Sequence, residues 1–313
     1  MTTYIRDLEN NSYYAGNYLV DAVQLKISKT GKEYMSGQLK DKTGGIRFIQ
    51  WEPDDLTEDL PNMSVVYAEF VIRVYNGEEE AIVHRMYPVS LKNIDNLDGL
   101  LEFPPERIDS MMREINDTVE DMSDLDYKAV IKEILQRDVL ESFASIPGGK
   151  FYHHALPGGL LMHTLGVLRV SKAIVSSYPA ETVNRDLLYC GAILHDIGKV
   201  QEFKINNIGL VERYTNEGSL EGHIYLGAKM VGDACDRLAI PAEKSMLLQH
   251  LILSHHGSTE FGSPVCPQTI EAFILHEADL IDASVYKYQT EYKTCVHGTV
   301  TRSQLLNQNV LFM

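Results

Sequence analysis

The sequence predicts a multidomain α+β protein in which a small five-stranded β-barrel precedes an all-α helical bundle. Short runs of alternating apolar and polar residues, separated by turn signals, occupy about residues 14–87. A polar, acidic stretch follows over 91–125, and helical periodicity punctuated by Gly and Pro begins at Asp126. We therefore expect a barrel at 1–90, a linker with a helical segment at 91–125, and the bundle at 126–313.

The barrel rests on five predicted strands. Leu19, Val23, Leu25 and Ile27 alternate along the first strand, with Asp21 as the one interruption. Two further strands flank the Lys-Thr-Gly-Gly turn at 42–45, and the last two, over 62–74 and 81–86, flank the Asn-Gly hairpin signal at 76–77. Five short antiparallel strands favour a closed barrel, because closure removes the sheet edges.

Helices are expected through the second half of the chain. Phe103-Pro104-Pro105 breaks the polar stretch and precedes a predicted helix from Arg107 onward. The remaining predicted helices span 126–137, 138–145, 160–177, 183–195, 222–239, 241–256, 267–283 and 301–308.

Composition limits the possible partners and compartments. The formal net charge of −16 argues against affinity for nucleic acid through a generally basic surface. Residues 26–47 depart from this average, with six basic residues against Glu33 and Asp41. No apolar run is long enough for a membrane span, the N-terminus is too polar for a secretory signal, and the four cysteines form no CxxC pair. A cytoplasmic protein with reduced thiols is expected.

Potential metal ligands gather at the ends of the apolar helices. An adjacent His-Asp step and an adjacent His-His step each close an apolar helix, where buried charge is costly without a purpose. A single histidine or aspartate of this kind is usually a core residue whose hydrogen bonds are made within the protein. Stability alone gives no reason for so many of them to occur at the ends of apolar helices. The candidate ligands are His163, His195, Asp196, His223, His255, His256 and Asp279.

Helix ends that converge in a bundle point such side chains into one cavity. Mixed nitrogen and oxygen ligands suit Mn²⁺, Fe²⁺, Co²⁺ or Zn²⁺ better than Ca²⁺ or Mg²⁺ alone. The two oxygens of Asp196 can bridge two ions, the arrangement used for in-line phosphoryl displacement by an activated water. The sequence therefore predicts a divalent-metal-dependent phosphodiesterase.

The spacing of these ligands resembles the H…HD…D signature of the HD-domain phosphohydrolases, and residues 195–199 read His-Asp-Ile-Gly-Lys. By analogy, one ion takes His163, His195, Asp196 and Asp279. A second ion shares Asp196 and takes His223, His255 and His256. A single ion held by the first four residues is the alternative.

Other polar residues near this motif have two interpretations. Lys199 lies one turn after Asp196, so its ammonium either holds the scissile phosphate or is solvated at a helix end. Asp196 and Lys199 are the predicted catalytic residues. His153 and His154 either line the cleft or bond the backbone. His276 is expected to support the ligands or to lie in the core.

The N-terminal part resembles a nucleic-acid-binding OB-fold through Gly-Lys-Glu-Tyr at 31–34, Leu-Lys-Asp-Lys-Thr-Gly-Gly-Ile at 39–46 and Trp51-Glu52. Such barrels stack bases on aromatic side chains while basic residues follow the backbone. The candidate contacts are Lys32, Tyr34, Lys40 and Arg47. The alternative is a half-buried Tyr34 with solvated lysines, and Trp51 is read as packing at the barrel end.

An OB-like barrel followed by an HD-like domain, in a chain of this length, resembles the YhaM family of bacterial 3′-to-5′ exoribonucleases. The resemblance covers nearly the whole chain. The resemblance implies stepwise removal of nucleotides from single-stranded RNA, or single-stranded DNA, with Mn²⁺ or a similar ion, and a homo-oligomer. Two alternatives remain: a phosphohydrolase of small nucleotides or cyclic dinucleotides, and a non-catalytic regulatory module. The barrel argues against the first, and the complete ligand set argues against the second.

Overall fold

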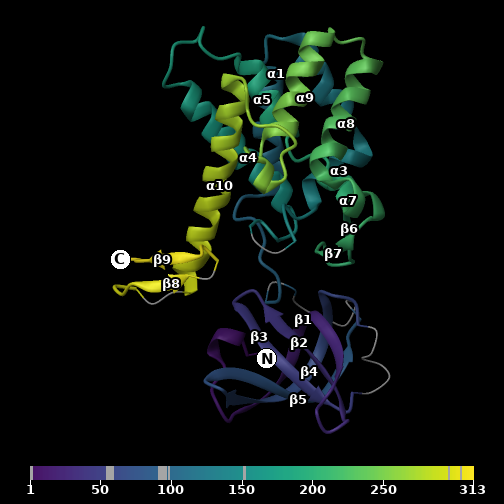
Figure 1. Ribbon diagram of the computed structural model, residues 1–313, viewed down its shortest axis with the longest axis vertical. Helices are drawn as coiled ribbons and strands as arrows, with labels where there is room; N and C mark the ends of the chain where they lie inside the picture. The colour runs from purple at the N-terminus through teal and green to yellow at the C-terminus, as the bar shows by residue number, and fades with distance from the viewer. Residues whose placement is uncertain are drawn as a thin grey trace. The chain divides into compact units, whose positions relative to one another are not determined.

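The computed structural model describes residues 3–53, 60–90, 97, 99–150, 153–294, 297–303 and 305–313 (Figure 1). The chain divides into two compact units, the first ending at Phe103 and the second beginning at Pro104. Each unit has a hydrophobic core of its own.

The first unit is a closed five-stranded barrel in the order β1-β2-β3-β5-β4, which is an OB-fold topology. Its strands are β1 (Tyr13–Ile27), β2 (Glu33–Asp41), β3 (Gly44–Trp51), β4 (Ser64–Tyr75) and β5 (Glu78–Pro88), and the 3₁₀ turn η1 (Ile5–Asp7) precedes them. The predicted barrel is confirmed, but the expectation of antiparallel pairing throughout is wrong. β3 and β5 run parallel, because an odd number of strands around a ring cannot alternate in direction everywhere.

Asp21 marks an irregularity in the long first strand. The pairing of β1 with β2 shifts between Asp21 and Gln24, and Ala22 has a φ of 50°, as expected at a β-bulge. β1 stops pairing with β4 at Val20, so beyond the bulge only β2 supports it. Leu25 and Ile27 are therefore exposed, although their alternation resembled that of core residues.

The second unit is a helical bundle built around α4 (Gly159–Val175), α5 (Arg185–Leu194) and α10 (Ile270–Thr294). The other helices are α1 (Ile108–Glu120), α2 (Leu125–Ile134), α3 (Arg137–Ser145), α6 (Lys199–Glu202), α7 (Asn216–Leu220), α8 (Gly222–Arg237) and α9 (Ala242–Ser254), with the 3₁₀ turn η3 (Thr259–Phe261) before α10. None of the helices in the described ranges is both long and apolar enough to cross a membrane.

The segment predicted as a linker contributes to this bundle. α1 packs against α4, and Met111, Ile115, Val119 and Met122 lie in the helical core. The apolar stripe of α1 has helical spacing but stands among many acidic residues, which is why it looked like a connection. Part of the predicted linker, residues 91–96 and 98, lies outside the described residues.

The second unit also contains two short hairpins, one between α6 and α7 and one after α10. β6 (Phe203–Ile205) pairs with β7 (Val211–Tyr214), and β8 (Thr301–Ser303) pairs with β9 (Gln308–Val310). The helix predicted over 301–308 is therefore wrong. Asn307 has a φ of 52°, a left-handed turn conformation that no helix contains.

Candidate metal centre

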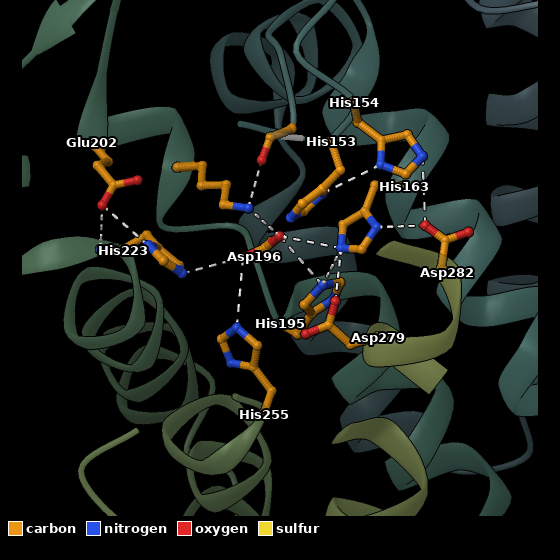
Figure 2. A network of polar contacts seen from close by, with 12 residues as sticks. His153, His154, His163, His195, Asp196, Glu202, His223, His255, Asp279 and Asp282 are labelled. Atoms are coloured by element: carbon orange, nitrogen blue, oxygen red, sulfur yellow. Dashed lines mark hydrogen bonds and ion pairs between the residues drawn. The ribbon is translucent and has the colours of Figure 1, made fainter. Parts of the chain in front are cut away.

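The candidate ligands lie mainly at helix ends that meet in the second unit. His163 is in the second turn of α4, and His195 and Asp196 directly follow α5. The remaining candidates belong to three other helices: His223 opens α8, His255 and His256 follow α9, and Asp279 lies within α10. Figure 2 shows the imidazoles of His163, His195, His223 and His255 turned toward Asp196.

The carboxylate of Asp196 is the centre of this cluster, and its two oxygens face different histidines. Oδ2 lies 3.5 Å from Nε2 of His163 and 3.4 Å from Nε2 of His195. Oδ1 lies 3.5 Å from Nε2 of His223 and 3.7 Å from Nε2 of His255. One carboxylate therefore joins two groups of imidazoles.

Asp279 and His256 extend these two groups. Oδ1 of Asp279 lies 3.1 Å from Nε2 of His163. The ring of His256 is 4.4 Å from that of His255 and 5.2 Å from that of His223. Ligand atoms of His223, His255 and His256 lie within 4.8 Å of one another, as do those of His163, His195 and Asp196.

Every one of these imidazoles is held by its Nδ1 atom. The acceptors are Asp282 Oδ2 for His163 at 2.7 Å, the Ala192 carbonyl for His195 at 2.9 Å, Glu202 Oε1 for His223 at 3.1 Å, the Ile252 carbonyl for His255 at 2.6 Å and the Phe261 carbonyl for His256 at 2.8 Å. A carbonyl or a carboxylate only accepts, so each Nδ1 carries the proton. Each ring therefore presents Nε2 as the atom that a metal would take, as in metal-binding histidines.

The residues present fit a divalent cation. Oδ1 of Asp196 and Nε2 of His223 and of His255 are buried, and within the described ranges they have no hydrogen-bond partner. Leaving buried polar atoms unsatisfied costs stability, and a cation placed among them would remove this cost.

The protonation states in the metal-free cluster are also suited to binding a cation. Burial alone would raise the pKa of Asp196, but the charge of the neighbouring Lys199 ammonium holds it well below its usual range. Burial alone would lower the pKa of His163, but the hydrogen bonds that its ring donates to the carboxylates of Asp279 and Asp282 raise it to about 10. A buried carboxylate is thus kept ionised, and a proton takes the place of a cation on His163.

Lys199 is buried rather than solvated. Its ammonium donates to Oδ2 of Asp196 and to the Gly148 carbonyl, each at 2.6 Å. The structure thus places the predicted catalytic lysine directly beside the central carboxylate.

Sequence reasoning missed two residues that orient the candidate ligands, Asp282 and Glu202, and it named a third, His276, only as a residue that either supports the ligands or lies in the core. Asp282 and Glu202 hold His163 and His223, and each lies one turn beyond a residue that was identified, Asp279 and Lys199 respectively. His276 donates from Nδ1 to the His255 carbonyl at 2.8 Å, a supporting contact. An i, i+3 search along the ligand-bearing helices would have found Asp282.

His153 and His154 lie next to this cluster. Nε2 of His154 is 3.5 Å from Oδ2 of Asp282, and its ring lies 4.0 Å from that of Tyr286. Burial and the charge of His163 lower the pKa of His153 to about 3 and that of His154 to about 2, so both are neutral near pH 7.

The candidate nucleic-acid contacts lie on β2, on β3 and in the turn before β2. Each basic side chain faces an acid: Lys32 pairs with Glu52 at 3.1 Å, Lys40 with Asp21 at 2.6 Å and Arg47 with Glu80 at 3.3 Å. The ring of Tyr34 lies 5.1 Å from that of Trp51, which is 47% exposed. Trp51 therefore forms an open aromatic pair on the barrel surface.

The fold and site define an HD-domain protein with an OB-like barrel before it. A family model described as "HD domain" matches residues 160–284, which include every candidate metal ligand. Among solved structures, the HD domain of the phosphodiesterase PgpH from Listeria monocytogenes is similar, with a TM-score of 0.31, 18% identity and coverage of 52% of this chain and 77% of that one. The second OB-fold domain of replication protein A from Methanococcus maripaludis has a TM-score of 0.24 and 22% identity, covering 28% of this chain and 95% of that one.

Curated relatives narrow this class to one family. The 3′-5′ exoribonuclease YhaM of Bacillus subtilis is 34% identical over 261 residues, covering 83% of this chain and 81% of that protein. YhaM of Listeria welshimeri is also 34% identical, over 82% of this chain and 81% of the relative. The chain belongs to the YhaM family.

Proposed function

We propose that this protein is a metal-dependent 3′-5′ exoribonuclease that hydrolyses the phosphodiester bonds of single-stranded RNA, and of single-stranded DNA as a second substrate. The observation that carries this is the convergence of four imidazole Nε2 atoms on the buried carboxylate of Asp196. The 3′-5′ exoribonuclease activity for which the YhaM relatives are named, and the OB-like barrel of this chain, both agree with a nucleic-acid substrate.

Two ions account best for the arrangement, with Mn²⁺ the first choice and Fe²⁺, Co²⁺ or Zn²⁺ as alternatives. One ion would be held by His163, His195, Asp196 and Asp279. The other would share Asp196 and be held by His223, His255 and His256. This division is supported by the two oxygens of Asp196, each of which faces one group of histidines.

Bound ions would act as Lewis acids, polarising the phosphoryl group and making water nucleophilic near neutral pH. The chain's own residues hold this site in place. Nδ1 hydrogen bonds fix the orientation of each imidazole, and His163, His195, Asp196 and His255 are buried away from bulk water. Lys199 holds the Asp196 carboxylate and adds positive charge beside the scissile phosphate, which is the catalytic role we assign to it.

The barrel is proposed to capture the strand. Tyr34 and Trp51 would stack bases, while Lys32, Lys40 and Arg47 would follow the phosphates in exchange for their present acidic partners. The expected cytoplasmic location and homo-oligomer stay predictions.

The test is incubation of the purified protein with 5′-labelled single-stranded RNA and Mn²⁺, with and without a chelator, resolved over time. A chelator-sensitive ladder that shortens from the 3′ end is expected. Asp196→Ala should abolish it while the fold persists, and Asp233→Ala, on the exposed side of α8, serves as the matched control. A metal-loaded protein that leaves RNA intact would refute the proposal and favour small nucleotides as substrates.

A further inference from the structure

We propose that the β6–β7 hairpin of the helical unit is a second contact surface for the substrate strand, binding the phosphates of single-stranded RNA beside the metal centre. This inference rests on the proposed function and adds a surface outside the barrel. Three features carry it: where the hairpin is attached, the charges on its solvent face, and the aromatic ring on its other face.

The hairpin is joined directly to α6, a helix that carries residues of the candidate metal centre. α6 is only four residues long, and its two end residues, Lys199 and Glu202, contact Asp196 and His223. β6 begins at the next residue, Phe203. After β7, Thr215 returns to the same helix, donating from its backbone N–H to the Glu202 carbonyl at 2.9 Å and from its hydroxyl to the Gln201 carbonyl at 2.7 Å. Both ends of the hairpin are thus fixed to the residues that orient the centre.

Its solvent face carries two like charges directly opposite each other. Lys204 pairs across the strands with Arg213, and both are exposed. Like charges in this position are destabilising unless an anion lies between them. Lys204 has no ion pair within the described part of the chain, and the nearest carboxylate to Arg213 is that of Glu212 at 3.8 Å. In a chain of net charge −16, this local excess of positive charge fits a polyanion.

The other face carries an aromatic ring. Phe203 and Tyr214 are cross-strand partners with rings 5.5 Å apart, and the buried Phe203 anchors the hairpin on the bundle. Tyr214 stays 40% exposed, and Nζ of Lys150 lies 5.4 Å from its ring centre. Lys150 is two residues from Gly148, whose carbonyl accepts from Lys199. An open tyrosine beside a lysine suits a stacked base with its phosphate nearby.

The test measures binding rather than turnover. Fluorescence anisotropy of a labelled single-stranded RNA would be followed over a range of salt, using the full chain with Asp196→Asn to prevent cleavage. K204Q/R213Q should lose two phosphate contacts, so the magnitude of the negative slope of log K against log[salt] should fall by about 1.4. At 0.1 M salt this change corresponds to about 25-fold weaker binding. Tyr214→Leu should weaken binding about fivefold or more with the slope unchanged.

The matched control is R137Q/K229Q, which removes the same charge from exposed sites elsewhere in the helical unit. It should retain the parent slope, and equal losses in the two double variants would overturn the hairpin proposal in favour of a general charge effect. A chain that binds no RNA would overturn both proposals. A chain that binds through the hairpin but does not shorten RNA from its 3′ end would refute the exonuclease activity alone.

Discussion

A single methyl group at Gly166 should disturb the metal centre without touching a ligand. Gly166 lies on α4, facing α10, and a Cβ there would stand 1.9 Å from Oδ1 and 3.2 Å from Oδ2 of Asp282. Asp282 would have to swing away, and its 2.7 Å hydrogen bond with Nδ1 of His163 would break. His163 would lose the partner that fixes both the position of its proton on Nδ1 and the orientation of its ring.

The expected magnitude follows from the role of such supporting hydrogen bonds. Loss of a residue that orients a ligand weakens metal binding or activity about 10–100-fold, or roughly 1.4–2.7 kcal/mol. Because Gly166→Ala and Asp282→Ala remove the same contact, the double variant should lose little more than either single variant.

The assay is calorimetric titration of the chelator-treated protein with Mn²⁺, with circular dichroism to verify the fold. Gly232→Ala on α8 is the matched control, since its nearest neighbour would be the flexible amide of Gln249 at 3.3 Å. Unchanged Mn²⁺ affinity in Gly166→Ala, or full additivity with Asp282→Ala, would refute the assigned role of Asp282.

Three further predictions concern charge and stacking. Since the pKa of His163 is raised from 6.5 to about 10, the metal-free protein should gain stability from its proton below pH 6.5 and lose it as pH rises toward 10. Thermal melts with chelator should show this decline, and His163→Gln should remove much of it; an identical slope in the variant would contradict the assignment. Lys199→Met should lower kcat/KM for RNA about 100-fold or more, and near-normal turnover would exclude a catalytic role. Trp51→Ala should weaken RNA binding by about 1–3 kcal/mol at unchanged metal content; unaltered binding would remove the Tyr34–Trp51 pair from strand capture.

The sequence revealed those candidate ligands whose place at the end of an apolar helix is unusual. His195-Asp196 and His255-His256 stand out because charge and imidazole at the end of an apolar helix need a reason. Asp282 and Glu202 did not stand out, because a carboxylate on a helix is ordinary until the packing shows which face it occupies. The hairpin at 203–214 was missed because its two strands are too short for a period of two to be recognised.

The amino-acid sequence by itself determined the five-stranded barrel, the helical bundle and the residues that meet around Asp196, because strand alternation, helical spacing and misplaced polar residues are all local signals. Only the tertiary structure decided the parallel closure of β3 on β5, the place of α1 in the bundle, and the partner of each Nδ1 atom. It also decided that Lys199 is buried against Asp196. Such facts depend on distances between segments far apart in the chain, which the packing of the whole core sets and no local pattern contains.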